Sequence, residues 1–153
     1  MHFLITNRPN NRNIQGYITR LKLYNVKNLV RVCERTYNDE FLKDAGIFVH
    51  DLFFKDGSIP SKRIIKDWFK LLKVMFLYET DEYIAIHCVS GLGRAPLLVV
   101  LALLELGMPF EEAIREIRAK KRNALNDEQL LFAESYRPKS RLRLENSKTC
   151  SVI

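Results

Sequence analysis

A cysteine and an arginine six residues apart, Cys88 and Arg94, lie on either side of a run that could bind phosphate. Gly91 and Gly93 permit tight backbone turns, so successive N–H groups can point at one anion. Pro96 suits the first turn of a helix, whose N-terminus would favour negative charge beside the run. That field favours the thiolate of Cys88, the form that attacks phosphorus, and the planar guanidinium of Arg94 can bind two phosphate oxygens. The spacing therefore predicts phosphoryl transfer through a cysteine nucleophile.

The elements expected to position this run are a strand before it and a helix after it. Residues 83–86 are apolar and predict the strand, and an unbroken apolar run from Leu97 predicts a buried helix. We expect His87, at the end of the strand, to hydrogen-bond and orient the loop. The phosphate-binding loop would then consist of Val89, Ser90, Gly91, Leu92, Gly93 and Arg94. An ordinary buried cysteine and a surface arginine are the alternative, but they do not account for the complete run between strand and helix.

The rest of the chain alternates between strand and helix patterns, which predicts an α/β fold with a central, mainly parallel sheet flanked by helices. In such sheets ligands bind at the carboxyl ends of strands, where the loop lies. Expected strands cover 3–5, 29–33, 47–50 and 83–86, and expected helices cover 14–24, about 38–46, 61–76, 96–106, 110–117 and 126–136.

Length and composition restrict the kind of protein. The 153 residues, 47% of them hydrophobic, suit one domain with a real core. A net charge of +7 attracts acidic partners, namely phosphorylated substrates, anionic membranes or nucleic acid, but no nucleic-acid motif accompanies the basic clusters. Three cysteines cannot form a disulfide scaffold, which indicates a reducing cytosol. The N-terminus turns polar too soon for a signal peptide, and residues 97–104 are too few to span a bilayer.

The C-terminus carries a second motif. Cys150 is followed by Ser, Val and Ile at the end of the sequence, which matches a prenylation signal and leaves the type of isoprenoid open. One lipid chain binds membranes only marginally, and basic residues can supply the second, electrostatic signal. Those residues are Arg137, Lys139, Arg141, Arg143 and Lys148. We therefore expect a loosely ordered basic tail over 139–153 and a location on the cytoplasmic face of plasma or endosomal membranes, or in the cytosol without the lipid.

Residues 87–96 resemble the cysteine-dependent protein tyrosine phosphatases, and within them the phosphatase of regenerating liver (PRL) family. Residues 30–37, 126–131, 136–139 and 150–153 support the narrower resemblance. It implies a dual-specificity-like phosphatase domain over 1–138 that needs no cofactor or metal. It also implies that Cys88 is the nucleophile, Arg94 the phosphate clamp and Asp56 the general acid. A disulfide between Cys33 and Cys88, binding to cyclin-M magnesium transporters and a homotrimer are further implications.

The chain departs from the family pattern at three places. The family's acid loop usually carries Trp-Pro-Phe-Asp-Asp-Gly, whereas residues 52–57 have Lys55 in place of one acid, so Asp56 is the only local proton donor. Ser90 replaces the usual alanine, and Thr149 replaces a second cysteine. In the absence of the resemblance, Asp56 would be read as a solvated turn residue and Cys33 as a small core residue.

Two classes of function follow. The first is a phosphatase that forms a phosphocysteine intermediate, and the second is a pseudophosphatase-like binding module whose catalytic pocket grips an acidic loop of a cyclin-M type transporter. Ala95 stands where many members of the wider superfamily carry a serine or threonine that assists departure of the thiolate, so the resemblance implies slow hydrolysis, compatible with both. Val89, Ser90 and Leu92 add no charge to the loop, which favours phosphoprotein over phosphoinositide substrates.

Overall fold

The computed structural model describes residues 1–76, 81–142 and 150–153, which form an α/β fold, as predicted. The strands are β1 (His2–Thr6), β2 (Asn28–Arg31), β3 (Phe48–Asp51), β4 (Tyr83–His87) and β5 (Ser151–Val152). The helices are α1 (Ile14–Leu23), α2 (Glu40–Asp44), α3 (Lys62–Phe76), α4 (Arg94–Glu105), α5 (Phe110–Lys120) and α6 (Asp127–Ser135). Within this part of the chain, no helix is long and apolar enough to cross a membrane.

The sheet has the strand order β3-β2-β4-β1-β5, and every neighbouring pair is parallel. Strand β4 lies in the middle, with Ile86 opposite Ile5 of β1 on one side and opposite Val30 of β2 on the other. Its residues from Ile84 to His87 are buried, as expected for a strand covered on both faces. The loop that follows β4 therefore starts from the centre of the sheet's carboxyl edge.

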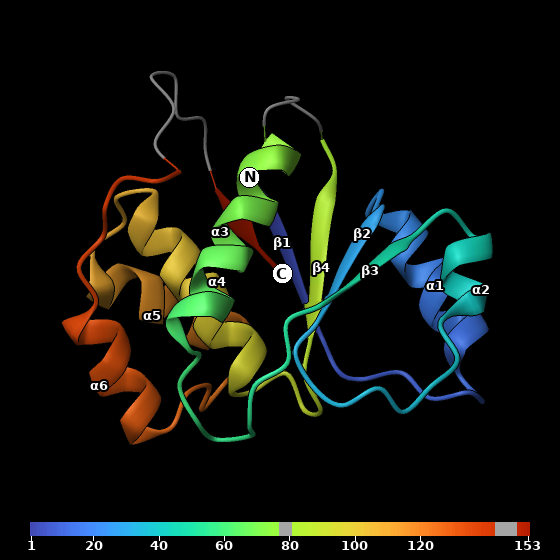
Figure 1. Ribbon diagram of the computed structural model, residues 1–153, viewed down its shortest axis with the longest axis horizontal. Helices are drawn as coiled ribbons and strands as arrows, with labels where there is room; N and C mark the ends of the chain where they lie inside the picture. Colours follow the sequence, from blue (N-terminus) through green and yellow to red (C-terminus); the bar gives the residue numbers. More distant parts are fainter. Residues whose placement is uncertain (77–80, 143–149) are drawn as a thin grey trace.

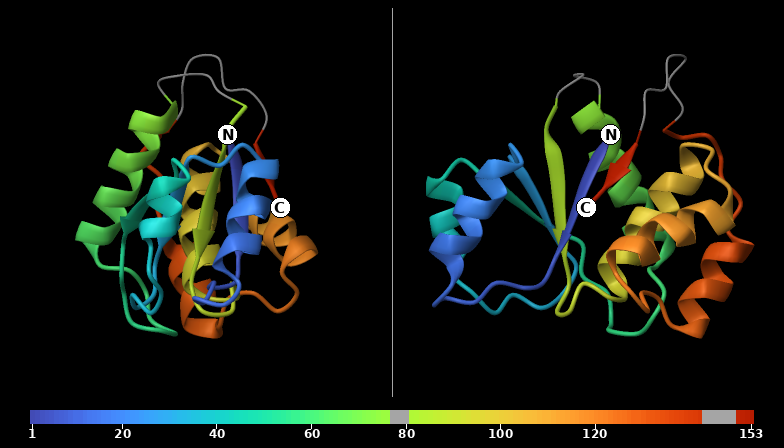
Figure 2. Two further views of the ribbon diagram at one scale, coloured as in Figure 1. Left: turned by 90° about the vertical axis from the view of Figure 1, so that its right-hand side faces the viewer. Right: turned by 180° about the vertical axis from the view of Figure 1, so that it is seen from behind.

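Helices cover both faces of the sheet, as Figure 1 shows. Helices α1 and α2 lie on one face, and α3, α4, α5 and α6 lie on the other (Figures 1 and 2). Every residue of α4 is buried, which confirms the prediction of a core helix after the loop. Trp68 of α3 is also buried, and its indole N–H donates to the Leu98 carbonyl at 2.8 Å, which fixes α3 against α4.

The expected strand over 29–33 ends two residues early, at Arg31. This arginine is fully buried and pairs with two carboxylates, Asp51 at 2.5 Å and Asp39 at 3.1 Å. Val32 and Cys33 remain buried, and the Val32 N–H still donates to the His87 carbonyl at 3.0 Å. Parallel pairing with β3 stops where the chain turns away, so Cys33 leaves the sheet beside the end of β4.

Part of the segment that the sequence predicts to be loosely ordered is bound to the domain. Glu105, buried at the end of α4, accepts hydrogen bonds from the Tyr136 hydroxyl (2.6 Å) and from the main-chain N–H groups of Lys139 (3.1 Å) and Arg141 (2.7 Å). Burial acts to raise the pKa of Glu105, but these hydrogen bonds outweigh it and lower the pKa. A buried carboxylate thus holds the chain beyond Pro138, and Leu142 is buried as well.

The last residues of the chain form β5, which the polar composition before them does not predict. Strand β5 pairs with the start of β1, and the main-chain groups of Ile153 bond Phe3 (2.9 Å) and Ile5 (2.8 Å). Val152 is buried. The unpaired edge of β1 provides these bonds, a long-range effect absent from local composition. Arg143, Lys148 and Thr149 lie outside the described residues, and the boundary at 138/139 stays a prediction.

Candidate active site

The predicted phosphate-binding loop runs between β4 and α4, as the strand–loop–helix pattern indicates. Cys88 directly follows β4, Arg94 is the first residue of α4, and both are almost completely buried. Gly91 has a φ of +72°, and a Cβ there would lie 2.9 Å from the main-chain oxygen of Thr6. Only glycine fits this position, because the conformation is left-handed and the neighbouring backbone leaves no room.

Two neighbouring loops hold the carbonyl groups of this loop. The Arg8 N–H donates to the Val89 carbonyl at 3.1 Å, and the Leu125 N–H donates to the Leu92 carbonyl at 2.7 Å. By contrast, across the described parts of the chain no hydrogen bond uses the main-chain N–H groups of residues 89–93 as donors. Uncommitted N–H groups at a helix N-terminus are suited to binding an anion.

Arg94 connects this loop to the loop before α3. Its Nη1 donates to the Phe54 carbonyl at 3.1 Å, and its Nε lies 3.2 Å from Oδ1 of Asp56. The Nε contact lacks hydrogen-bond geometry, so this buried N–H has no acceptor among the described residues. Oε2 of Glu34 lies farther away, 3.7 Å from Nη1. The guanidinium is therefore fixed in place and still has a donor to offer.

The structure brings Asp56, the predicted acid, to Arg94. Asp56 lies in the loop between β3 and α3, and its side chain is 78% exposed. Two amides of the α6 N-terminus hold the same loop: Asn126 Nδ2 donates to the Gly57 carbonyl at 2.9 Å, and Gln129 Nε2 donates to the Ser58 carbonyl at 3.2 Å. The acid loop therefore has a defined position over the phosphate-binding loop.

Asn126 and Gln129 are positioning residues that sequence reasoning found only in part. Asn126 is predicted as a helix cap, but its contact with the acid loop is not. The two residues form a capping box, and Gln129 is buried beside Gly93. The spacing Asn-x-x-Gln is the sequence signal for a capping box, but it does not indicate what the remaining amide protons contact.

His87 hydrogen-bonds the main chain at the start of the loop, as predicted. Its Nδ1 lies 3.0 Å from the Cys88 carbonyl, and its Nε2 lies 2.7 Å from the Tyr37 hydroxyl. A carbonyl can only accept, so Nδ1 carries the proton and Nε2 accepts from Tyr37. Burial lowers the pKa of His87 to about 4, so the imidazole is neutral at physiological pH.

The structure places Cys33 beside the same histidine. Its Sγ lies 3.7 Å from Nδ1 of His87, and it belongs to the same buried cluster as Cys88. Both cysteines are free thiols. Burial raises the pKa of the Cys33 thiol. The two cysteines thus both lie at the carboxyl edge of the sheet, after adjacent strands, as the topology requires.

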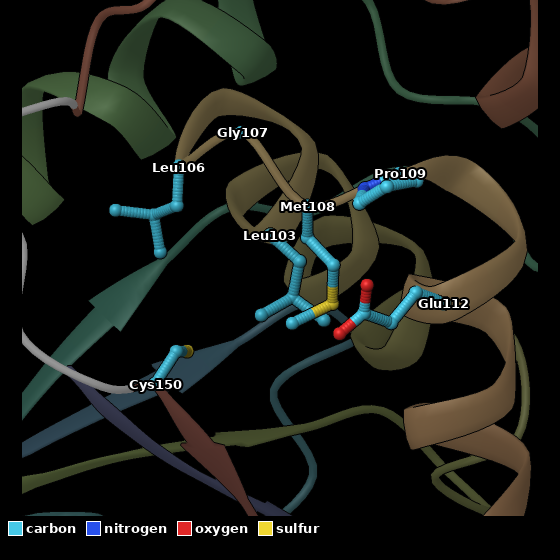
Figure 3. Close-up of a pocket in the computed structure, with 7 residues that line it drawn as sticks. All are labelled: Leu103, Leu106, Gly107, Met108, Pro109, Glu112 and Cys150. Carbon is cyan, nitrogen blue, oxygen red and sulfur yellow. The ribbon is translucent and has the colours of Figure 1, made fainter.

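Cys150 lies away from this edge. It directly precedes β5, which pairs with the first residues of β1, so it is at the amino end of the sheet. Figure 3 shows its side chain at a pocket between the end of α4 and the start of α5, with Leu103, Leu106 and Met108 among the lining residues. Burial raises the pKa of the Cys150 thiol to about 11. Among the residues that the structure describes, no group of three His, Cys, Asp or Glu side chains could hold a metal ion.

Comparisons with known proteins agree with this geometry. A family model described as "Polymorphic toxin system, DSP-PTPase phosphatase" matches residues 6–108. The PRL-1 phosphatase of Drosophila melanogaster is 48% identical over 99% of this chain and 88% of its own length. Human protein tyrosine phosphatase type IVA 3 is 47% identical over 97% of this chain and 86% of its own length. A solved structure titled as a putative protein tyrosine phosphatase from Leishmania major is 36% identical, with a TM-score of 0.77 over 89% of this chain and 87% of that one.

Proposed function

Because this chain belongs to the PRL, or type IVA, family of protein tyrosine phosphatases, we propose that Cys88, Arg94 and Asp56 carry out its reaction on phosphoproteins. The observation that supports this assignment is the set of groups around Cys88. A buried thiol lies at the base of a loop whose N–H groups at 89–93 are uncommitted. A buried guanidinium and an exposed carboxyl group complete the set.

In the proposed first step, the thiolate of Cys88 attacks phosphorus, an S–P bond forms, and the P–O bond to the leaving group breaks. The N–H groups of 89–93 and Arg94 stabilise the negative charge on the equatorial oxygens. Asp56 gives its proton to the leaving oxygen. In the second step Asp56, now a carboxylate, takes a proton from a water molecule that attacks phosphorus, and Cys88 departs as a thiolate. The residues need no metal or cofactor for either step.

The contact between Arg94 and Asp56 supports separate roles for them: Arg94 binds the phosphoryl group and Asp56 transfers the proton. At 3.2 Å the carboxylate partly neutralises the guanidinium while the loop holds no anion. A phosphoryl group competes for the same guanidinium because it offers two oxygens to the planar fork. Binding of substrate therefore releases the Asp56 side chain from Arg94, and Asp56 then takes up a proton from solvent, which it gives to the leaving oxygen.

Ala95 supports a slow second step. It is fully buried next to Arg94 and has no hydroxyl to donate to the departing thiolate. We expect Ala95→Ser to raise steady-state turnover roughly tenfold, because a hydrogen bond to developing charge contributes about 1.5–3 kcal/mol. Intact mass after mixing with an aryl phosphate should show phosphate on Cys88 in the parent and less of it in the variant. An unchanged second phase in pre-steady-state kinetics would mean that Ala95 does not limit hydrolysis.

The placement of both cysteines beside His87 supports redox control of the site. Peroxide would oxidise Cys88 to a sulfenic acid, and the Cys33 thiol would displace water to form the disulfide. We expect mild peroxide to stop turnover reversibly, with a Cys33–Cys88 peptide in mapping and recovery after thiol reductant. Cys33→Ser should instead accumulate irreversible oxidation at Cys88. Overoxidised Cys88 with free Cys33 in the parent would contradict the proposal.

A second candidate function is the binding module, in which the pocket holds an acidic loop of a cyclin-M type magnesium transporter. The observation that favours it is that Arg94 lies near two carboxylates, Asp56 and Glu34, so its surroundings accept carboxylates. Binding of a partner's acidic side chain would occupy the same cradle and stop catalysis. Competition between that acidic peptide and orthovanadate tests this second function. A module that uses the catalytic pocket would show competition, and a module that binds its partner elsewhere would show no competition. The homotrimer stays a prediction.

We further propose that a prenyl group on Cys150 and the basic segment anchor the protein to the cytoplasmic face of membranes. The half-buried position of Cys150 means that residues 150–153 must leave the sheet before an enzyme can modify the thiol. We expect Cys150→Ser to move the protein from the membrane fraction into the cytosol, whereas Cys33→Ser should remain with membranes. Unchanged fractionation of the Cys150 variant would rule out the anchor.

A further inference from the structure

A groove lined by three cations lies beside the phosphate-binding loop. It follows β1 and the start of the β1–α1 loop, encloses about 310 Å³, and is lined by Arg8, Arg20 and Lys121. Tyr17, Asn13 and Leu21 also line it, and no acidic residue does. The β1–α1 loop and the loop after β4 lie at the same edge of the molecule (Figure 2).

One wall of this groove is hydrogen-bonded directly to the phosphate-binding loop, and the other is connected to it through a short turn. On one side, the Arg8 N–H donates to the Val89 carbonyl at 3.1 Å. On the other side, Lys121 begins a turn in which its carbonyl accepts from Ala124 at 3.0 Å, and the next residue, Leu125, donates to Leu92 at 2.7 Å. An occupant of the groove would therefore lie next to whatever the loop holds.

The charge of the groove has no internal compensation. Within residues 1–76, 81–142 and 150–153, none of Arg8, Arg20 and Lys121 forms an ion pair. Arg8 and Lys121 are only partly exposed, so less solvent screens their charges than those of a fully exposed lysine. Three unpaired cations around one concave surface repel each other, and an anion between them relieves that repulsion.

We propose that this groove binds a second anionic side chain, phosphorylated or carboxylate, of a peptide substrate whose phosphorylated residue occupies the loop above Cys88. The proposal rests on the phosphatase function argued above and names its substrate class. A peptide fits better than a compact sugar phosphate because Leu4, Leu21 and Tyr24 line the groove together with the cations. These apolar side chains suit the neighbouring residues of a chain. The acidic peptide would thus bind at two adjoining sites, the phosphate-binding loop and the groove.

The test compares two peptides of one sequence, the first with a single phosphotyrosine and the second with an added phosphoserine. Because each partly exposed ion pair contributes modestly, we expect kcat/KM to be about fivefold to tenfold higher for the doubly phosphorylated peptide at low salt. This ratio should fall to near one in the double variant Arg20→Ala/Lys121→Ala. The matched control is Lys22→Ala/Lys120→Ala, which removes the same charge from neighbouring exposed positions outside the groove.

Binding to Cys88→Ser protein, measured by calorimetry, separates this proposal from the catalytic assignment because it needs no turnover. The proposal is supported if the protein binds the doubly phosphorylated peptide more tightly, and if this preference is lost in Arg20→Ala/Lys121→Ala and kept in Lys22→Ala/Lys120→Ala. This result would support binding in the groove even if the assigned catalytic roles are wrong. Equal affinities of the parent for the two peptides overturn the proposal, as does an equal loss in the control variant. If binding of a soluble inositol bisphosphate depends on Arg20 and Lys121, and binding of the doubly phosphorylated peptide does not, the proposed peptide substrate class is wrong.

Discussion

Replacing Cys88 by serine is expected to reduce phosphatase turnover on the order of 10⁴-fold or more while oxyanion binding stays measurable. Serine keeps the size of the side chain, but its hydroxyl is hardly ionised at neutral pH and lacks an adjacent base, because the neutral His87 has both ring nitrogens engaged with Tyr37 and the Cys88 carbonyl. The N–H groups of 89–93 and Arg94 remain in place. Turnover of an aryl phosphate and calorimetric binding of phosphate to the same protein measure the two effects separately.

Cys150→Ser is the matched control, since it makes the same substitution at the opposite end of the sheet and should retain turnover in solution. Substantial activity in Cys88→Ser would remove Cys88 as the nucleophile. Loss of both turnover and phosphate binding would show that the substitution disturbs the loop itself, and circular dichroism of the variant then distinguishes a local change from unfolding.

Asp56→Asn is expected to slow hydrolysis of a tyrosyl phosphate roughly 10²–10³-fold and that of an activated aryl ester less than about tenfold. Asparagine has nearly the same shape but cannot supply the proton that a poor leaving group needs. The side chain is 78% exposed, so little effect on folding stability is expected. The measurement is kcat/KM for the tyrosyl ester and for the activated aryl ester, compared between the parent and the variant.

Asp44→Asn, an exposed position at the end of α2, serves as the matched control for loss of one negative charge. Equal losses for both esters in Asp56→Asn would contradict a general acid and indicate that the residue acts only through Arg94. An unchanged rate for both would leave the chain without a local proton donor, because Lys55 replaces the other acid of the loop.

The parts of the fold that follow from local sequence could be predicted. The loop at 88–94 lies within one strand–loop–helix unit, so its glycines, its cysteine and its arginine indicate both the shape and the chemistry. The apolar run of α4 predicts burial for the same reason, since nothing polar interrupts it. Placement of Cys33 near Cys88 follows from parallel strands ending at one edge.

The parts that depend on partners far away in the chain could not be predicted. Strand β5 has two residues and no pattern of its own, and it forms because β1 offers an edge; Ser151 Oγ meets Nδ1 of His2 at a separation of 149 residues. In the sequence, Glu105 is an ordinary charged residue at the end of a helix. Its burial is explained only by the hydrogen bonds that it accepts from Tyr136 and Arg141. The amides of Asn126 and Gln129 likewise reach a loop that sequence order places far from them.

Under the proposed anchor, strand β5 and the membrane would compete for the same four residues, 150–153. If the proposed lipid on Cys150 enters a bilayer, it would draw residues 150–153 away from β1, break the hydrogen bonds of Ile153 with Phe3 and Ile5, and expose the buried side chain of Val152. Two equilibria that share a segment are coupled reciprocally: whatever free energy β5 adds to the fold is subtracted from membrane affinity, and the bilayer weakens the sheet edge by the same factor. The membrane-bound and free proteins would therefore differ in their β1 edge, open in one and closed in the other.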